Sequence, residues 1–374
     1  MYERLASHTY TSKIGFMRII LTCVLFVYLA ACTSKIVDSN VYFEEGDLPP
    51  LINLVGEKLN IQEIINPRGL MIKDGLAVVY ERKNNNDNKF HIIDLDSKKY
   101  LASKGIDGLG PGEVTVISQI EDTGELNKIW VYDSEYRKFS KFDLRDSSKL
   151  AEEQFRSPET TVFMTATSWV SGNSLLGNPV DGWGKYIHIN TAGDTLALFG
   201  DWNDMIKGKE LQGGIEVSDL DANLISNIFQ GTLKGSPDKR FFVKAGIGVD
   251  YIDIITIENH SIQTIYGPDK EIPEFSIGYW DGFQMPQFER DVKDSYLDVY
   301  PGTDTFFVLY FGKPYKELGS SNNLNRIFEF DYDGNIINQF QLDYPIYGFA
   351  VDEENRAIYG VTVDSEPNLV RFDY

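Results

Sequence analysis

Cysteine is almost absent from this sequence. The 374 residues contain two cysteines, Cys23 and Cys32, and both lie within the first 32 positions. The rest of the chain therefore has no thiol for a disulfide, for a cysteine-ligated metal or for nucleophilic catalysis. Without cross-links the protein has to rely on a large hydrophobic core, and about 340 residues are enough to build one.

Recognisable catalytic and metal-binding patterns are also missing. No Gly-x-Ser-x-Gly elbow is present, so a serine hydrolase of that type has no support. His91, His188 and His260 have no metal-ligand spacing, and we expect structural roles for them. The stretch Asp331–Asn335 resembles the start of a calcium loop, but Leu342 stands where that loop needs a glutamate. We predict a hairpin turn there, no metal and no cofactor.

Basic residues are in short supply. The chain has 35 Lys and Arg against 56 Asp and Glu, a formal net charge of −21. An acidic chain is a poor partner for nucleic acid and for anionic lipid headgroups. We interpret the acidity as a solubility feature and predict no nucleic-acid partner.

A hydrophobic run long enough to span a bilayer is missing as well. Ile19–Leu29 is apolar and follows the basic Arg18, but a spanning helix needs about 20 apolar residues. The run ends in Leu29-Ala30-Ala31-Cys32, the pattern that a lipoprotein signal peptidase cleaves before lipidating the cysteine. We therefore predict a signal peptide and a lipidated Cys32.

These features define the expected domains. Residues 1–31 are a signal peptide, with Met17 as an alternative start, residues 32–40 are a lipidated tether, and residues 41–374 are a single domain. Thr33, rather than Asp, follows Cys32, which favours an outer-membrane lipoprotein of the cell envelope. The sequence leaves open whether the domain faces the periplasm or the cell surface.

Helical periodicity is rare, and short alternating stretches bounded by turn residues predict an all-β fold. The expected helices are short, at Gln62–Ile65 and Ala222–Phe229. One unit, a strand, a polar turn and a second strand, recurs along the chain. Its copies lie at 90–103, 139–155, 186–200, 251–267, 327–342 and 369–374.

The spacing of these copies predicts a six-bladed β-propeller. Equivalent positions are separated by 49, 47, 66, 75 and 42 residues, and a four-stranded blade takes about 40–50. Because the sixth copy lacks its outermost strand, we expect an N-terminal strand, 51–55 or 41–43, to pair with 368–374 and close the ring. The alternative prediction is a β-sandwich, or two smaller β-domains.

A family resemblance accompanies the stretch Gly105-Ile-Asp-Gly-Leu-Gly-Pro-Gly-Glu113. The lipoprotein pattern, the short β-repeats and this Gly-x-Gly-Pro-Gly-Glu turn resemble the TolB-like six-bladed propeller lipoproteins of the Bacteroidetes. The resemblance implies the fold and the envelope location, and little about activity. From the residues themselves, we interpret Gly110, Pro111, Gly112 and Glu113 as a structural turn, in which Glu113 accepts backbone N–H groups of the neighbouring blade. A phosphate loop would need a following helix, and 114–117 is strand-like.

The two long intervals are the best place to look for binding, since loops on a rigid scaffold carry function. They span 201–214 and 267–291, and a third aromatic loop contains Trp183. Our candidate ligand-binding residues are Trp183, Trp202, Tyr279, Trp280, Phe283, Arg290 and Arg68. Exposed aromatic rings suit sugars or a protein partner, although aromatic residues in such loops can also pack as local core.

Two functions follow as hypotheses. The first is a binding or scaffold lipoprotein that holds a glycan, a peptide or an envelope protein. The second is an enzyme, a glycoside hydrolase or lyase, because a convergent pair of carboxylates is invisible in a sequence. The lack of any catalytic signature favours the first, with no catalytic residue assigned.

Overall fold

The structure is a computed structural model that describes most of the chain after residue 39. The chain divides into Met1–Ser39 and Asn40–Tyr374. The described residues are 40–374 without 83–87, 159–161, 210, 212–213, 319–322 and 363. The expected signal peptide and Cys32 therefore lie outside the described residues.

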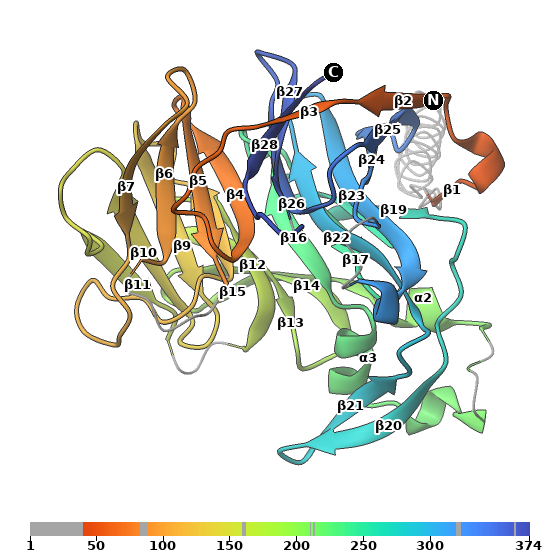
Figure 1. The fold of residues 1–374 in the computed structure, drawn as a ribbon. Helices are drawn as coiled ribbons and strands as arrows, with labels where there is room; N and C mark the ends of the chain where they lie inside the picture. The colour runs from red at the N-terminus through yellow and green to blue at the C-terminus, as the bar shows by residue number, and fades with distance from the viewer. Residues whose placement is uncertain are drawn as a thin grey trace, which may run out of the picture. The chain divides into compact units, whose positions relative to one another are not determined.

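Six sheets form a ring of propeller blades (Figure 1), and the four main strands of each blade run antiparallel. The first blade comprises β4 (Pro67–Lys73), β5 (Leu76–Glu81), β6 (Phe90–Asp94) and β7 (Lys99–Lys104). The second comprises β8 (Gln119–Asp122), β9 (Lys128–Asp133), β10 (Lys138–Asp143) and β11 (Glu153–Arg156). The third comprises β12 (Met164–Ser171), β13 (Ser174–Pro179), β14 (Gly184–Asn190) and β15 (Thr195–Asp201).

The last three blades each include a strand from the N-terminal segment. The fourth comprises β16 (Gly231–Gly235), β17 (Phe241–Gly246), β18 (Tyr251–Thr256), β19 (Ser261–Tyr266) and β1 (Val41–Tyr42). The fifth comprises β22 (Lys293–Pro301), β23 (Thr305–Pro314), β24 (Arg326–Asp331), β25 (Ile336–Leu342) and β2 (Leu51–Leu54). The sixth comprises β26 (Ile346–Asp352), β27 (Ala357–Thr362), β28 (Leu369–Asp373) and β3 (Gly56–Lys58).

The repeat read from the sequence corresponds to the outer half of each blade. Each copy is the third strand, its turn and the fourth strand, and the sixth copy is β28 alone. The six-bladed prediction is therefore confirmed. The two long intervals hold insertions rather than a seventh blade, since the extra hairpin, β20 (Phe275–Trp280) with β21 (Phe283–Phe288), forms a separate two-stranded sheet.

The ring closes in the predicted manner but with a different strand. The closing strand is β3, which pairs antiparallel with β28 through Gly56↔Phe372 and Lys58↔Val370. Both predicted candidates, 51–55 and 41–43, were wrong. Instead, β2 adds in parallel to β25, and β1 adds in parallel to β19. Alternation of apolar and polar residues predicts a strand, but it does not predict which blade edge that strand pairs with.

Helices are few, and the structure corrects one of the two expected. α3 (Ala222–Ile228) is present, and the Asp221 carboxylate caps it by accepting the Leu224 N–H at 2.7 Å. Residues 62–65 form turns and bends instead of a helix. The other described helices are short: α2 (Asn203–Ile206), η1 (Glu45–Asp47), η3 (Val217–Asp219) and η4 (Tyr315–Glu317).

The two insertions form one structure, which we call the insertion lobe (residues 202–230 and 267–292). The Asn223 side chain donates to the Gln284 carbonyl at 2.7 Å, so α3 packs against the hairpin β20–β21, as Figure 1 shows at its lower edge. The hydrophobic core of the lobe, which includes Trp202, Leu224 and Phe229, is continuous with Tyr251 and Tyr266 of the fourth blade. The lobe therefore flanks the fourth blade on both sides along the chain.

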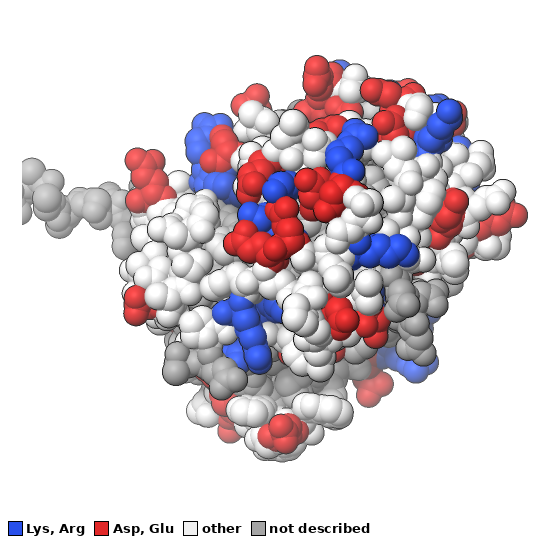
Figure 2. All heavy atoms as spheres, turned by 90° about the vertical axis from the view of Figure 1, so that its left-hand side faces the viewer, with Lys and Arg blue, Asp and Glu red and all other residues white. Residues whose placement is uncertain are grey.

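Charges are mixed on the outer face of the ring. Figure 2 shows acidic and basic side chains side by side, without a large field of one sign. Among the ion pairs of the ring are Lys128–Glu152 at 2.6 Å and Lys141–Glu153 at 2.6 Å, both within the second blade. Surface pairs of this kind contribute little stability each.

Candidate functional site

The central channel is lined by the innermost strands of the blades. β4, β8, β16, β22 and β26 all contribute residues to two small cavities, one beside the first half of these strands and one beside the second half. The first, which we call the channel cavity, has a volume of about 140 Å³. The second, the far cavity, has about 130 Å³. Each has room for a few waters or a small ion, but not for a sugar chain.

The channel cavity contains an ion pair that joins three blades. Lys234 on β16 contacts Asp298 on β22 at 2.7 Å, and the other oxygen of Asp298 accepts the backbone N–H of Phe349 on β26 at 3.1 Å. The Asp298 carboxylate also accepts the Val299 N–H at 2.9 Å. The bonds to Lys234 and to Phe349 join the fifth blade to its two neighbours, so the Asp298 carboxylate has a structural role.

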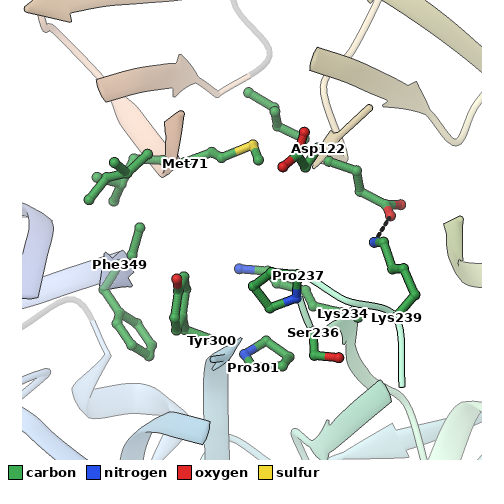
Figure 3. Close-up of a pocket in the computed structure, with 15 residues that line it drawn as sticks. Met71, Asp122, Lys234, Ser236, Pro237, Lys239, Tyr300, Pro301 and Phe349 are labelled. Carbon is green, nitrogen blue, oxygen red and sulfur yellow. Dashed lines mark ion pairs between the residues drawn. The ribbon is translucent and has the colours of Figure 1, made fainter. Parts of the chain in front are cut away.

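The far cavity has both apolar and charged lining residues, among them Met71, Phe349, Asp122 and Lys239 (Figure 3). Glu121 is buried, and it accepts bonds from the Ser168 hydroxyl at 2.6 Å and the Trp169 N–H at 3.0 Å. Lys239 lies 3.6 Å from the same carboxylate, and Figure 3 marks this ion pair. Burial raises the pKa of Glu121, with Lys239 opposing that effect. Its partners belong to the third and fourth blades, which again indicates a structural bond.

A larger cavity lies where the insertion lobe meets the fourth and fifth blades. We call it the mouth cavity, and its volume is about 470 Å³. Ile247 lines both this cavity and the channel cavity. The remaining lining residues combine amide, apolar, aromatic and charged side chains: Asn227, Ile228, Gln230, Gly248, Phe288, Glu289, Arg290, Val292, Asp294 and Tyr315. A concave site with apolar walls and a few polar groups is what ligand sites offer.

Asp294 is the polar group that distinguishes the mouth cavity. It is half-buried at the start of β22, and no described residue donates a hydrogen bond or an ion pair to it. Burial raises its pKa to about 6, with no charged neighbour contributing. Removing a carboxylate from water without a compensating partner is unfavourable. The carboxylate is therefore available to a bound group.

The predicted aromatic residues divide into exposed and buried ones. Tyr279, Trp280 and Phe283 are 70%, 77% and 55% exposed at the tip of the hairpin β20–β21. Trp183 is half-buried and packs against the core of the lobe. Trp202 is fully buried and stacks on Phe229 with ring centroids 4.9 Å apart. An exposed platform at Trp202 is therefore wrong, because this ring forms the lobe's core.

The two predicted arginines line different cavities. Arg68 is exposed at the start of β4 and lines the channel cavity with Tyr80 and Tyr347. Arg290 is exposed and lines the mouth cavity. The structure thus brings Arg290 together with Phe288 and Asp294, whereas Arg68 and the hairpin tip do not line this cavity.

The Gly-x-Gly-Pro-Gly-Glu stretch is a turn between the first and second blades. The Glu113 carboxylate accepts the Gly110 N–H at 2.7 Å, so it closes its own turn rather than binding a neighbouring blade as expected. The turn contacts the second blade through its backbone, since the Gly112 N–H donates to the Gln154 side chain on β11 at 2.9 Å. Gly112 has a φ of +79°, a conformation that glycine adopts at little cost.

Two of the histidines meet at a blade interface. His188 on β14 and His260, in the turn before β19, have ring nitrogens 3.4 Å apart. Burial lowers the pKa of His188, and the neighbouring His260 lowers it further. Across the described ranges, no three His, Cys, Asp or Glu side chains gather as a metal site would require. Nor does the described part of the chain contain a helix with the length and apolar character to cross a bilayer.

Two buried lysines lie beside the Trp202 ring, and one of them, Lys244, ties the lobe to the ring of blades. Lys244 on β17 donates to the Asn178 side chain and to the Phe229 carbonyl, each at 2.8 Å. Its ammonium lies 4.8 Å from the Trp202 ring. The second, Lys185, pairs with the fully buried Asp253 at 2.6 Å. Burial lowers the pKa of Lys244 to about 7. The phenol of Tyr186 donates to Asp253 at 2.6 Å, which helps to satisfy this carboxylate.

Sequence reasoning missed several cavity residues. Asp294, Tyr315, Asn227 and Gln230 stand in ordinary polar or strand-like contexts, and nothing in their spacing indicates convergence. Arg290 was a candidate because it lies in an insertion rich in aromatic residues, whereas Phe288, in the same insertion, was not among the candidates.

The comparison with family profiles agrees with this architecture. The profile of the TolB-like 6-blade propeller-like family matches residues 56–354. A crystal structure of a Bacteroides fragilis protein inferred to be exported has 13% identity, covers 89% of this chain and 98% of its own, and has a TM-score of 0.50. The WD40 repeats of RRP9 have 10% identity, cover 85% of this chain and 97% of their own, and have a TM-score of 0.47. A search of curated proteins finds no match.

The family match is the likeness that assigns the chain to a family. It runs from the closing strand β3 into the sixth blade. Because the profile covers well over half of the sequence, the chain belongs to the TolB-like six-bladed propeller family.

Proposed function

We propose that this protein is an extracytoplasmic lipoprotein whose propeller holds a ligand in the mouth cavity. The observation that carries the proposal is the cavity of about 470 Å³ walled by α3, by Phe288 of the hairpin and by Asp294. The ring supplies the rigid scaffold, and the insertions supply the walls. The chemistry of the lining, with amides, aromatic rings and one uncompensated carboxylate, suits recognition of a polar molecule with an apolar face.

The carboxylates of the central channel favour a binding protein over an enzyme. Its two deep carboxylates, Asp298 and Glu121, accept hydrogen bonds that join blades. A general acid or base needs a carboxyl group within reach of the substrate, and these two are occupied by protein donors. The proposal therefore assigns no catalytic residue.

The envelope location rests on the N-terminal sequence. The run Ile19–Leu29 followed by Leu-Ala-Ala-Cys supports export and lipidation at Cys32. The structural likeness to a Bacteroides fragilis protein inferred to be exported is in keeping with this location. Acyl chains on Cys32 would hold the propeller at the outer membrane.

A cavity-filling substitution tests the proposal. A side-chain carbon added at Gly248 would lie 3.9 Å from its nearest neighbour, the Ile228 carbonyl oxygen, so Gly248→Leu fills the cavity without a close contact at its base. The matched control is Gly172→Leu, in the β12–β13 turn, where nothing lies within 4 Å. The full-length chain in detergent is applied to arrays of bacterial polysaccharides and envelope peptides. We expect binding that Gly248→Leu abolishes and Gly172→Leu retains. Equal binding by both variants, or none by the wild type, contradicts the proposal.

A further inference from the structure

The Asp294 carboxylate has no internal partner among the described residues, although Lys293 precedes it, Lys313 is its cross-strand partner on β23, and Lys316 follows three residues later. Lys293 pairs with Asp269 at 2.6 Å, and Lys313 donates to Asn323 at 2.6 Å. Lys316 lies 3.7 Å from Asp291. Each of these cations is therefore directed to another group. Within the described chain, nothing neutralises the carboxylate that faces the mouth cavity.

The charge balance of the lining favours a cation. Glu289 and Asp294 contribute two carboxylates, and Arg290 contributes one guanidinium. Phe288 and Tyr315 add aromatic rings to the same walls. An aromatic face attracts a cation through its quadrupole and also packs against a flat apolar body.

We propose that the mouth cavity selects a ligand carrying an ammonium or guanidinium group, which pairs with Asp294 while the ligand's apolar face packs on Phe288 and Tyr315. This inference rests on the proposed function and names the class of ligand for the same site. A charge-assisted hydrogen bond to a half-buried carboxylate is stronger than one between neutral groups. The cavity has room for one such residue, either an amino sugar or a basic amino-acid side chain.

Two matched pairs of probes distinguish these sources. The first pair is a glucosamine trimer and its N-acetylated counterpart, and the second is trilysine and the same peptide with acetylated side chains. Binding to the full-length chain in detergent is measured by calorimetry at pH 7.5. We expect the cationic member of one pair to bind about tenfold more tightly than its acetylated partner. The pair that shows this preference identifies the source.

The variant Asp294→Asn keeps the shape of the side chain and removes its charge. We expect it to abolish the preference for the cation, whereas Asp291→Asn, an exposed aspartate outside the cavity lining, retains it. Lowering the pH from 7.5 to 5 should also reduce the preference, because burial raises the pKa of Asp294 to about 6 and protonation removes the charge.

Several results would overturn the inference. They are equal binding of both members of each pair, no binding of any probe, and a preference that survives in Asp294→Asn. Acetylated probes that bind equally well and are lost in Gly248→Leu would overturn this inference alone and leave the proposed function standing. Failure of the wild type to bind anything on the arrays would contradict both this inference and the proposed function.

Discussion

The stability of this propeller should depend on pH through Lys244. Burial lowers the pKa of this ammonium from 10.5 to about 7 in the folded protein. The unfolded chain then binds more protons than the folded one between these two values, so the free energy of unfolding rises with pH in that range. The full shift corresponds to about 5 kcal/mol. Between pH 7 and pH 9.5 we expect a rise of about 3 kcal/mol from this group.

Urea denaturation at pH 7, 8 and 9.5 measures this rise. In Lys244→Met the contribution disappears, because the ammonium that titrates in this range is gone. The difference in free energy of unfolding between wild type and variant should therefore change by about 3 kcal/mol over the range. Lys98→Met, which removes a surface lysine paired with Glu57, should keep the wild-type slope. The window stops at pH 9.5 because burial raises the pKa of Tyr186 and opposes the trend at higher pH. Parallel pH profiles for wild type and Lys244→Met would refute the reasoning.

Two further predictions concern ring closure and the aromatic residues. Gly56→Val should lower the free energy of unfolding by about 2 kcal/mol, because a side-chain carbon at Gly56 would lie 2.6 Å from atoms of β28. The control Gly46→Val lies in open space and should change the free energy of unfolding by less than about 0.5 kcal/mol. Equal losses in urea denaturation would contradict closure through β3. Trp202→Ala should cost about 3–5 kcal/mol and Trp280→Ala less than about 0.5 kcal/mol, since one ring is fully buried and the other 77% exposed. Similar losses in thermal unfolding would contradict this division of the aromatic residues.

The fold was largely predictable because its signal is periodic. Each blade repeats the same strand, turn and strand, so Asp94, Asp143 and Asp331 mark equivalent turns without any knowledge of tertiary contacts. The identity of the closing strand was not predictable. β3 is only three residues long and contains Gly56 and Lys58, so it has no hydrophobic alternation to mark it. Its position is decided by pairing with β28, which is a tertiary contact.

The site was less predictable than the fold. Trp202 and Trp280 both have Asp and Gly among their near neighbours in the sequence, and yet one ring is buried and the other exposed. Burial of Trp202 depends on α3 folding back over it, which no local pattern reports. Asp294 became recognisable only when the structure placed three lysines elsewhere and left its carboxylate without a partner.

The three strands of the N-terminal segment have a mechanical consequence. Going along the chain from Asn40, β1 covers the fourth blade, β2 the fifth and β3 the sixth. A force applied at the N-terminal side would load these strands in series, so β1 and β2 would detach before the load reached the pair that closes the ring. The parallel pairings of β1 and β2 would break first and lengthen the N-terminal segment while the six blades stay folded. The N-terminal segment would in this way limit the force that reaches the pairing of β3 with β28.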